Sequence, residues 1–165
     1  GGYDGPGAFL NEEIPAGAKP TDLGYSAVTE DNLHYGEYGW TREYPNGDLK
    51  PHFGVDYYGD EYSDVFAMYD GTVIGNHSRS FIRAYGEYSV RTQSIINTKI
   101  YNVDYGHLSR NVLSIGQRIS AGDLVGYMGR LGNLAGTSFP THVHISIWRP
   151  LQGCPSMGFV RPHWY

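Results

Sequence analysis

Cysteine is almost absent from this sequence, and its scarcity excludes two kinds of small protein. The chain has 165 residues and one cysteine, Cys154, so it cannot hold an internal disulfide framework or a zinc site made of paired thiolates. Any metal must therefore bind nitrogen and oxygen ligands. The length is sufficient for one domain with its own hydrophobic core, and we expect a monomer.

Positive charge and long apolar runs are also scarce. Only three lysines are present and the net charge is −5, so the chain lacks a stripe of basic residues that could bind phosphate groups. No apolar run approaches the roughly 18 to 20 residues of a membrane span. We therefore expect the protein neither to bind nucleic acid nor to insert into a membrane. The H-E-x-x-H, G-x-S-x-G and P-loop motifs are missing too, which removes the usual sequence support for three enzyme classes.

Glycine and tyrosine, in contrast, are abundant, with 23 and 15 copies. Short apolar or alternating runs bounded by Gly, Asn and Asp predict a mostly β fold with few or no long helices. We expect an irregular lead-in at 1–37, a main domain at 38–148 and a tail at 149–165. Strands are predicted at 53–58, 65–69, 72–75, 87–93, 99–105, 123–128 and 142–148.

Two predicted turns connect these strands. Asp70-Gly71 separates two runs as a hairpin turn would, and Ile95-Ile96-Asn97-Thr98 is expected to form another turn.

Strand parity gathers potential metal ligands on one face of two strands. In 142–148, His142 and His144 alternate with the apolar Val143, Ile145 and Ile147; in 52–57, His52 and Asp56 lie opposite Phe53, Val55 and Tyr57. Each pair alone is a weak signal, but together they supply the imidazole and carboxylate ligands that zinc accepts. The pattern predicts a zinc site formed by His52, Asp56 and one or both of the paired histidines.

The same residues resemble the ordered motifs of a known family, the lysostaphin-like or LytM-type zinc peptidases of family M23. The resemblance covers 38–148 and includes Tyr38-Gly39-Trp40-Thr41-Arg42, His52-Phe53-Gly54-Val55-Asp56, the stretch 65–73, Tyr105-Gly106-His107-Leu108-Ser109, the glycine-punctuated stretch 116–126 and His142-Val143-His144-Ile145.

This resemblance implies one zinc ion held by His52, Asp56 and His144, with a zinc-bound water as the nucleophile. It also implies that His107 and His142 are the catalytic histidines, one as general base and the other as electrostatic partner, in an order that the sequence does not decide.

Substrate contacts are expected from Arg42, Tyr38 and Tyr105. A surface charge is the alternative for Arg42, and strand packing is the alternative for the tyrosines. Compared with the family, the loop at 134–141 and the segment between Val73 and Tyr105 are long, and the latter carries Arg79, Arg83 and Arg91. The other histidines, His34, His77 and His163, match no motif, and we interpret them as surface or packing residues.

The resemblance implies antiparallel β-sheets that form a groove, with the lead-in at 1–37 packed on or near it. It also implies an extracytoplasmic zinc endopeptidase that hydrolyses peptide cross-links of bacterial peptidoglycan. Because the chain is acidic, we favour D-alanyl cross-links over glycyl-glycine bridges. Two alternatives are a non-catalytic zinc-binding module that regulates a cell-wall hydrolase or binds a partner, and a metal-free β domain. Residues 1–37 could also cover the groove, with Asn11 or Asn32 reaching the metal.

Overall fold

The computed structural model describes residues 9–22, 36–76, 85–130, 141–153 and 156–164. In these ranges the chain forms strands, turns and irregular segments without an α-helix. The predicted mostly β, antiparallel architecture is confirmed. None of the described segments is a helix long and apolar enough to cross a membrane.

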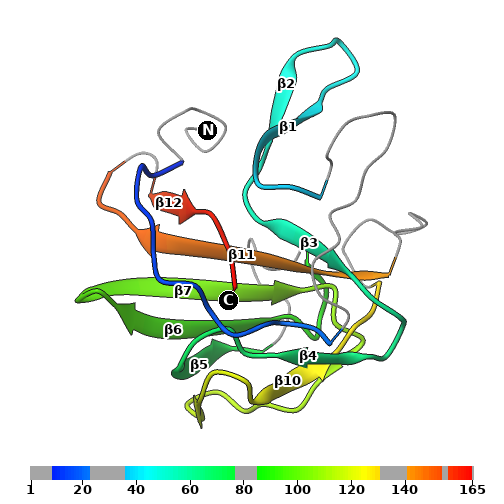
Figure 1. The fold of residues 1–165 in the computed structure, drawn as a ribbon, viewed down its shortest axis with the longest axis vertical. Helices are drawn as coiled ribbons and strands as arrows, with labels where there is room; N and C mark the ends of the chain where they lie inside the picture. Colours follow the sequence, from blue (N-terminus) through cyan, green and yellow to red (C-terminus); the bar gives the residue numbers. More distant parts are fainter. Residues whose placement is uncertain (1–8, 23–35, 77–84, 131–140, 154–155, 165) are drawn as a thin grey trace.

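A seven-stranded sheet is the main layer of the molecule (Figure 1). Its strands run in the order β12-β11-β7-β6-β5-β9, and β3 also pairs with β11. Their bounds are β3 Val55–Tyr58, β5 Gly71–Gly75, β6 Val90–Ile96, β7 Lys99–Gly106, β9 Arg118–Ile119, β11 His142–Pro150 and β12 Met157–Val160. All of the pairings within this sheet are antiparallel.

Two smaller sheets complete the fold. One has the order β4-β10-β8, with bounds Asp64–Phe66, Leu124–Tyr127 and Arg110–Asn111. The other is a ribbon of β1 (Gly39–Glu43) and β2 (Leu49–His52). Figure 1 shows this ribbon projecting away from the main sheet, with β2 leading directly toward β3.

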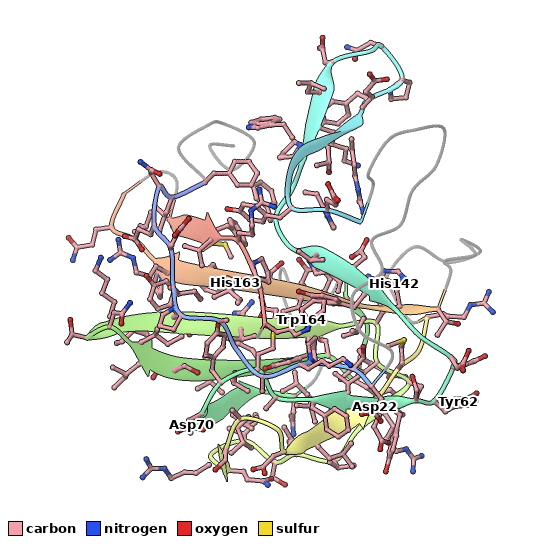
Figure 2. All side chains as sticks on the ribbon, in the orientation of Figure 1. Asp22, Tyr62, Asp70, His142, His163 and Trp164 are labelled. Carbon is pink, nitrogen blue, oxygen red and sulfur yellow. The ribbon has the colours of Figure 1, made fainter. Side chains whose placement is uncertain are left out.

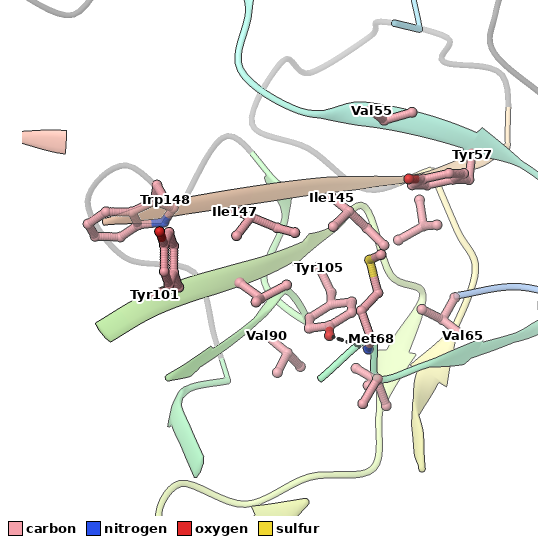
Figure 3. Close-up of a cluster of buried hydrophobic side chains, with 14 of the residues drawn as sticks. Val55, Tyr57, Val65, Met68, Val90, Tyr101, Tyr105, Ile145, Ile147 and Trp148 are labelled. Atoms are coloured by element: carbon pink, nitrogen blue, oxygen red, sulfur yellow. Dashed lines mark hydrogen bonds between the residues drawn. The ribbon is translucent and has the colours of Figure 1, made fainter. Parts of the chain in front are cut away.

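The hydrophobic core lies between the main sheet and the β4-β10-β8 sheet. Val143, Ile145 and Ile147 of β11 are completely buried, as the alternation predicted. Tyr105 of β7 lies among them, and its hydroxyl accepts a hydrogen bond of 2.9 Å from the Met68 amide (Figure 3). Each such aliphatic side chain contributes roughly 1.5–3 kcal/mol of transfer free energy. This core fixes which face of β11 remains for polar residues.

One predicted strand and one predicted turn differ from the structure, and a second turn is shorter than predicted. The run 52–57 is not one strand, because β2 ends at His52, where it pairs with β1, and β3 begins at Val55, where it pairs with β11. The chain therefore bends at Phe53-Gly54. Asp70-Gly71 is not a hairpin turn, because β4 and β5 belong to different sheets. The turn after β6 is confirmed in a shorter form, at Asn97 and Thr98, which both have positive φ.

The segments near the two chain ends are more closely integrated into the fold than a lead-in and a tail would be. The segment predicted as a tail contains β12, whose Val160 and Phe159 pair with Ile147 and Trp148 of β11. This strand forms because its apolar residues complete the edge of the main sheet.

Residues 9–22 are irregular, as predicted, but they are tied down from β12 to β4. The Leu10 amide donates to the Phe159 carbonyl, and the Phe66 amide donates to the Pro20 carbonyl. Asn11 is exposed beside Glu12, which binds Arg149 at the far end of β11 from His142. At roughly 3.3 Å per strand residue, this position is too distant for Asn11 to act as a metal ligand. Asn32 lies outside the described residues.

Candidate metal centre and active site

Two neighbouring strands place the predicted ligands side by side. Asp56 of β3 is the direct cross-strand partner of His144 of β11, so both side chains leave the same face of the sheet, opposite the core. His52, at the end of β2, reaches the same point because the chain bends after it. The structure thus brings together His52, Asp56 and His144, all of them buried, with ligand atoms within 4.8 Å of one another.

The geometry of this cluster fits a zinc ion. Asp56 Oδ1 lies 2.8 Å from His144 Nδ1 and 3.4 Å from His52 Nε2, and these two nitrogens are 3.2 Å apart. Ligand atoms bound tetrahedrally at about 2 Å from zinc would be roughly 3.3 Å apart. The three residues therefore need little rearrangement to hold the metal.

The protonation of His52 supports this interpretation. Its Nδ1 donates to the Glu37 carbonyl at 2.9 Å, because a carbonyl oxygen can only accept. In the neutral ring, Nε2 then carries a lone pair, which faces the Asp56 carboxylate. A metal ion between the Nε2 lone pair and the carboxylate would remove the electrostatic repulsion between them.

The charge states of the other two ligands also suit metal binding. Burial opposes ionisation of Asp56, but its hydrogen bond with His144, its close contact with His52 and the charge interactions with both imidazoles hold the pKa of Asp56 well below its ordinary value. Burial lowers the pKa of His144 to about 3, although the hydrogen bond and charge of Asp56 act in the opposite direction. The carboxylate is thus ionised and the imidazole neutral at pH 7, the forms that bind metal.

The predicted catalytic histidines lie beside this cluster. His142 is at the start of β11 (Figure 2), and its Nε2 is 3.7 Å from Asp56 Oδ1. His107 follows β7, and its ring centroid is 4.7 Å from that of His142. Both side chains are buried to more than nine-tenths. The cluster therefore contains two imidazoles next to the three potential ligands.

His107 is held in an unusual backbone conformation. Its φ is +65°, a left-handed value that residues other than glycine seldom adopt. The His107 amide donates to the Tyr85 carbonyl at 2.6 Å. The His107 carbonyl oxygen packs closely on Gly129, where an added Cβ would lie only 2.7 Å from it. Strain of this kind costs about 1–3 kcal/mol and gathers at functional sites.

Arg42 does reach the cluster, but there it contacts Asp56, one of the three potential metal ligands. Its Nη2 donates to Asp56 Oδ2 at 2.9 Å, which leaves Oδ1 directed at the histidines. Ser146, which no sequence motif marked, lies on the other side of the cluster with its Oγ 2.7 Å from His144 Nε2. Tyr85, equally unmarked, stacks on His144 with centroids 4.6 Å apart.

The two predicted substrate tyrosines lie elsewhere. Tyr105 is completely buried in the core, so it has no surface with which to contact a substrate. Tyr38 is 9% exposed, donates to the Phe159 carbonyl at 2.9 Å and packs edge-on against Phe9. The predicted substrate role of Tyr105 is corrected to core packing, and Tyr38 packs between the N-terminal segment and β12.

The remaining predictions concern residues outside the cluster. Arg91 lies in β6, within the strand predicted at 87–93, and forms an ion pair of 2.7 Å with the buried Asp104. His163 is exposed and its Nε2 donates to the Ile14 carbonyl at 2.7 Å, in keeping with the surface or packing role expected of it. His34, His77, Arg79, Arg83 and nearly all of the loop at 134–141 lie outside the described residues.

Comparison with known proteins gives a consistent result. The sequence profile of peptidase family M23 matches residues 50–155. The catalytic domain of the prophage-encoded M23 protein EnpA from Enterococcus faecalis, in the form of a point mutant, is 26% identical, with a TM-score of 0.60 over 88% of this chain and 94% of that one. The resemblance found in the sequence motifs is confirmed.

Two further structures share the fold at lower identity. A zinc-containing peptidase from Vibrio cholerae is 21% identical with a TM-score of 0.61, over 81% of this chain but only 37% of that longer one. The catalytic domain of the antimicrobial peptidase lysostaphin from Staphylococcus simulans is 21% identical with a TM-score of 0.56, over 76% of this chain and 85% of that one. The present chain therefore covers most of two isolated catalytic domains, but only about a third of the longer peptidase from Vibrio cholerae.

Proposed function

The chain belongs to peptidase family M23 and is a metallopeptidase domain, and on that premise we propose that it is a zinc-dependent endopeptidase that hydrolyses peptide cross-links of bacterial peptidoglycan. The observation that carries this proposal is the convergence of His52, Asp56 and His144 within 4.8 Å, beside a pair of histidines that are not needed as ligands. A site that only stabilised the fold would have no use for that pair.

Each residue has a distinct part in the proposed reaction. His52, Asp56 and His144 would hold the metal. Bound there, zinc would supply a Lewis acid that polarises the scissile carbonyl and lowers the pKa of water to about 7. His107 and His142, with ring centroids 4.7 Å apart, share two tasks: one accepts a proton, and the other donates a hydrogen bond to the negative charge that develops on the carbonyl oxygen.

Among peptidoglycan cross-links, we propose the D-alanyl bond of directly linked stem peptides in preference to the glycyl-glycine bridge. The net charge of −5 supports this choice, because an acidic enzyme lacks the cationic steering that would draw a secreted lytic factor to an anionic wall. The substrate lies outside the cytoplasm, so the proposal also places the enzyme in an extracytoplasmic compartment, where we expect it to act as a monomer.

Purified protein incubated with defined cross-linked muropeptides tests the proposal. The zinc-loaded protein should cleave a D-alanyl cross-link faster than a pentaglycine-bridged substrate, and a chelator should abolish both reactions until zinc is restored. Stoichiometric zinc binding without cleavage of either substrate would contradict the enzyme and favour a non-catalytic module of the same fold. Faster cleavage of the glycine bridge would overturn only the substrate preference.

A further inference from the structure

The register of the main sheet leaves an open place next to His144. Across β11 and β7, His144 is opposite Gly106, so the strand neighbour on the side away from Asp56 has no side chain. The Tyr85 ring occupies this place: a Cβ at Gly106 would lie 2.8 Å from Tyr85 Cβ and Cγ. Glycine at position 106 thus permits an aromatic ring to lie against the imidazole of a metal ligand.

Tyr85 contacts both a proposed ligand and a proposed catalytic histidine. Its ring stacks on His144 at 4.6 Å with an interplanar angle of 27°, and it meets His107 edge-on at 5.8 Å. Its backbone carbonyl also accepts the His107 amide at 2.6 Å, which holds His107 in its left-handed conformation. A single residue therefore connects the two histidines through three separate contacts.

Ser146 supplies the hydrogen-bond partner for the nitrogen of His144 that points away from Asp56. Its Oγ is 2.7 Å from His144 Nε2, it is completely buried, and it also hydrogen-bonds with the Tyr85 hydroxyl. In the structure Nδ1 lies 2.8 Å from Asp56 Oδ1. For Nδ1 to bind a metal ion, its lone pair must face the cluster, which requires that Nε2 carry the proton and donate a hydrogen bond to Ser146.

Gly54 preserves the space for this hydrogen bond. A Cβ at position 54 would lie 2.7 Å from both His144 Nε2 and Ser146 Oγ, and it would also overlap the Ile145 carbonyl oxygen. Gly54, the glycine of the H-x-G-x-D stretch, thus leaves room for the hydrogen bond between His144 and Ser146 of β11. Two glycines and two hydroxyl-bearing residues surround the same imidazole.

We propose that Tyr85 and Ser146 form a positioning pair for the metal centre: Ser146 sets the tautomer of His144, and Tyr85 fixes the plane of that imidazole together with the backbone of His107. This inference rests on the proposed function. Residues that orient a metal-bound imidazole in this way change metal affinity or activity about 10–100-fold when removed.

The test compares Ser146→Ala, Tyr85→Phe and Tyr85→Leu with the unaltered protein. The zinc dissociation constant is measured by competition with a fluorescent chelator, and kcat and KM are measured on a cross-linked muropeptide. Ser146→Ala should weaken zinc binding about 10–100-fold. Tyr85→Phe keeps the ring and should cause a smaller loss. Tyr85→Leu removes the ring and should weaken zinc binding. It should also lower kcat with little change in KM, because His107 loses its edge-on contact with the ring, although the backbone carbonyl at position 85 remains.

Two buried residues of the same sheet provide matched controls. Ser94 Oγ donates to the Asp70 carbonyl at 2.6 Å, and the Tyr101 hydroxyl donates to Glu12 Oε2 at 2.7 Å. Ser94→Ala and Tyr101→Phe each remove a comparable hydrogen bond away from the cluster, so they should lower the free energy of unfolding while leaving the zinc dissociation constant unchanged.

The outcomes separate the two proposals. If the unaltered protein binds no zinc, the proposed function fails and the positioning pair fails with it. If the unaltered protein binds zinc and cleaves its substrate, but Ser146→Ala and Tyr85→Leu bind zinc within twofold of it, only the positioning pair is overturned. Equal losses of zinc affinity in the variants and in the controls would likewise overturn it, because the effect would then be one of general stability.

Discussion

The Nη2 atom of Arg42 donates a hydrogen bond of 2.9 Å to Oδ2 of Asp56. Arg42 belongs to β1 of the projecting ribbon, whereas Asp56 belongs to β3 of the main sheet. The contact therefore ties the ribbon to the cluster of His52, Asp56 and His144, and the other carboxylate oxygen, Oδ1, faces the two imidazoles.

Replacement of Arg42 by glutamine should therefore weaken zinc binding. Without the guanidinium, the Asp56 carboxylate is free to rotate away from the two imidazoles, and loss of such an outer contact typically costs about 10–100-fold in metal affinity or activity. Chelator competition measures the change. Arg110→Gln, at an exposed position in β8, is the control and should bind zinc normally. Normal zinc affinity in Arg42→Gln would show that the contact does not position Asp56.

Gly54→Ala should disturb both folding and metal binding. The new Cβ would meet the Ile145 carbonyl, which is backbone and cannot move cheaply, and we expect a loss of about 1–3 kcal/mol in the free energy of unfolding. Zinc affinity should fall as well. In Gly59→Ala the new Cβ would meet the flexible end of Met128 and the Ser63 hydroxyl rather than backbone, so this control should change little. Similar behaviour of the two variants in urea titrations and zinc binding would contradict the steric argument.

Chelation should lower the midpoint of thermal unfolding. A ligand present at about 1,000 times its dissociation constant stabilises the folded state by about 4 kcal/mol, and for a domain of this size each kcal/mol corresponds to roughly 2–4 °C. Calorimetry with zinc and with chelator should therefore differ by roughly 8–16 °C, and added zinc should restore the higher midpoint. Identical midpoints would indicate that the cluster binds no metal in the folded state.

The metal-free protein should lose stability on acidification. The pKa of His144 is lowered by burial from 6.5 to about 3 in the folded state, so the unfolded chain binds a proton at this residue more readily than the folded one does. Stability should therefore fall as the pH drops from about 6.5 toward 3. The lowered pKa of Asp56 acts in the same direction at the acidic end of this range.

Urea titrations of chelator-treated protein at pH 7.5, 6.5, 5.5 and 4.5 measure this effect. His144→Gln lacks the titrating imidazole, so its stability should depend less steeply on pH over this range. An equally steep dependence in His144→Gln would show that other groups cause the loss.

The sequence predicted the ligand cluster because its signal is local. His52 and Asp56 are four residues apart, His142 and His144 are two apart, and alternation along β11 separates the histidines from the apolar Val143 and Ile145. The alternation predicted over 52–57 assumed one continuous strand, which was wrong. The conclusion survived because the bend at Phe53-Gly54 still directs the His52 and Asp56 side chains to one point.

The substrate assignment of Tyr105 was wrong for a reason that the sequence contained. Tyr101, Val103 and Tyr105 alternate along β7 and are all buried on the core side, so the parity argument used for β11 would have placed Tyr105 in the core. Its position next to the His107 motif was the misleading signal.

Tyr85, in contrast, could not have been found in this way. It lies far along the chain from His144, and only the register of β7 against β11 puts Gly106, and with it the tyrosine ring, beside that imidazole. The hairpin predicted at Asp70-Gly71 failed for the same kind of reason, since the assignment of β4 and β5 to different sheets depends on distant partners.

The most direct test of this account is zinc content measured together with turnover in two single variants. His144→Ala removes a ligand, whereas His107→Asn removes a flanking imidazole and keeps a residue that tolerates the left-handed backbone at φ +65°. Elemental analysis after dialysis should find zinc lost from His144→Ala and retained at about one ion per chain in His107→Asn, with cleavage of the cross-linked muropeptide reduced by about 100-fold or more in both. Zinc loss from both variants, or normal turnover in His107→Asn, would contradict the division of this site into metal ligands and catalytic histidines.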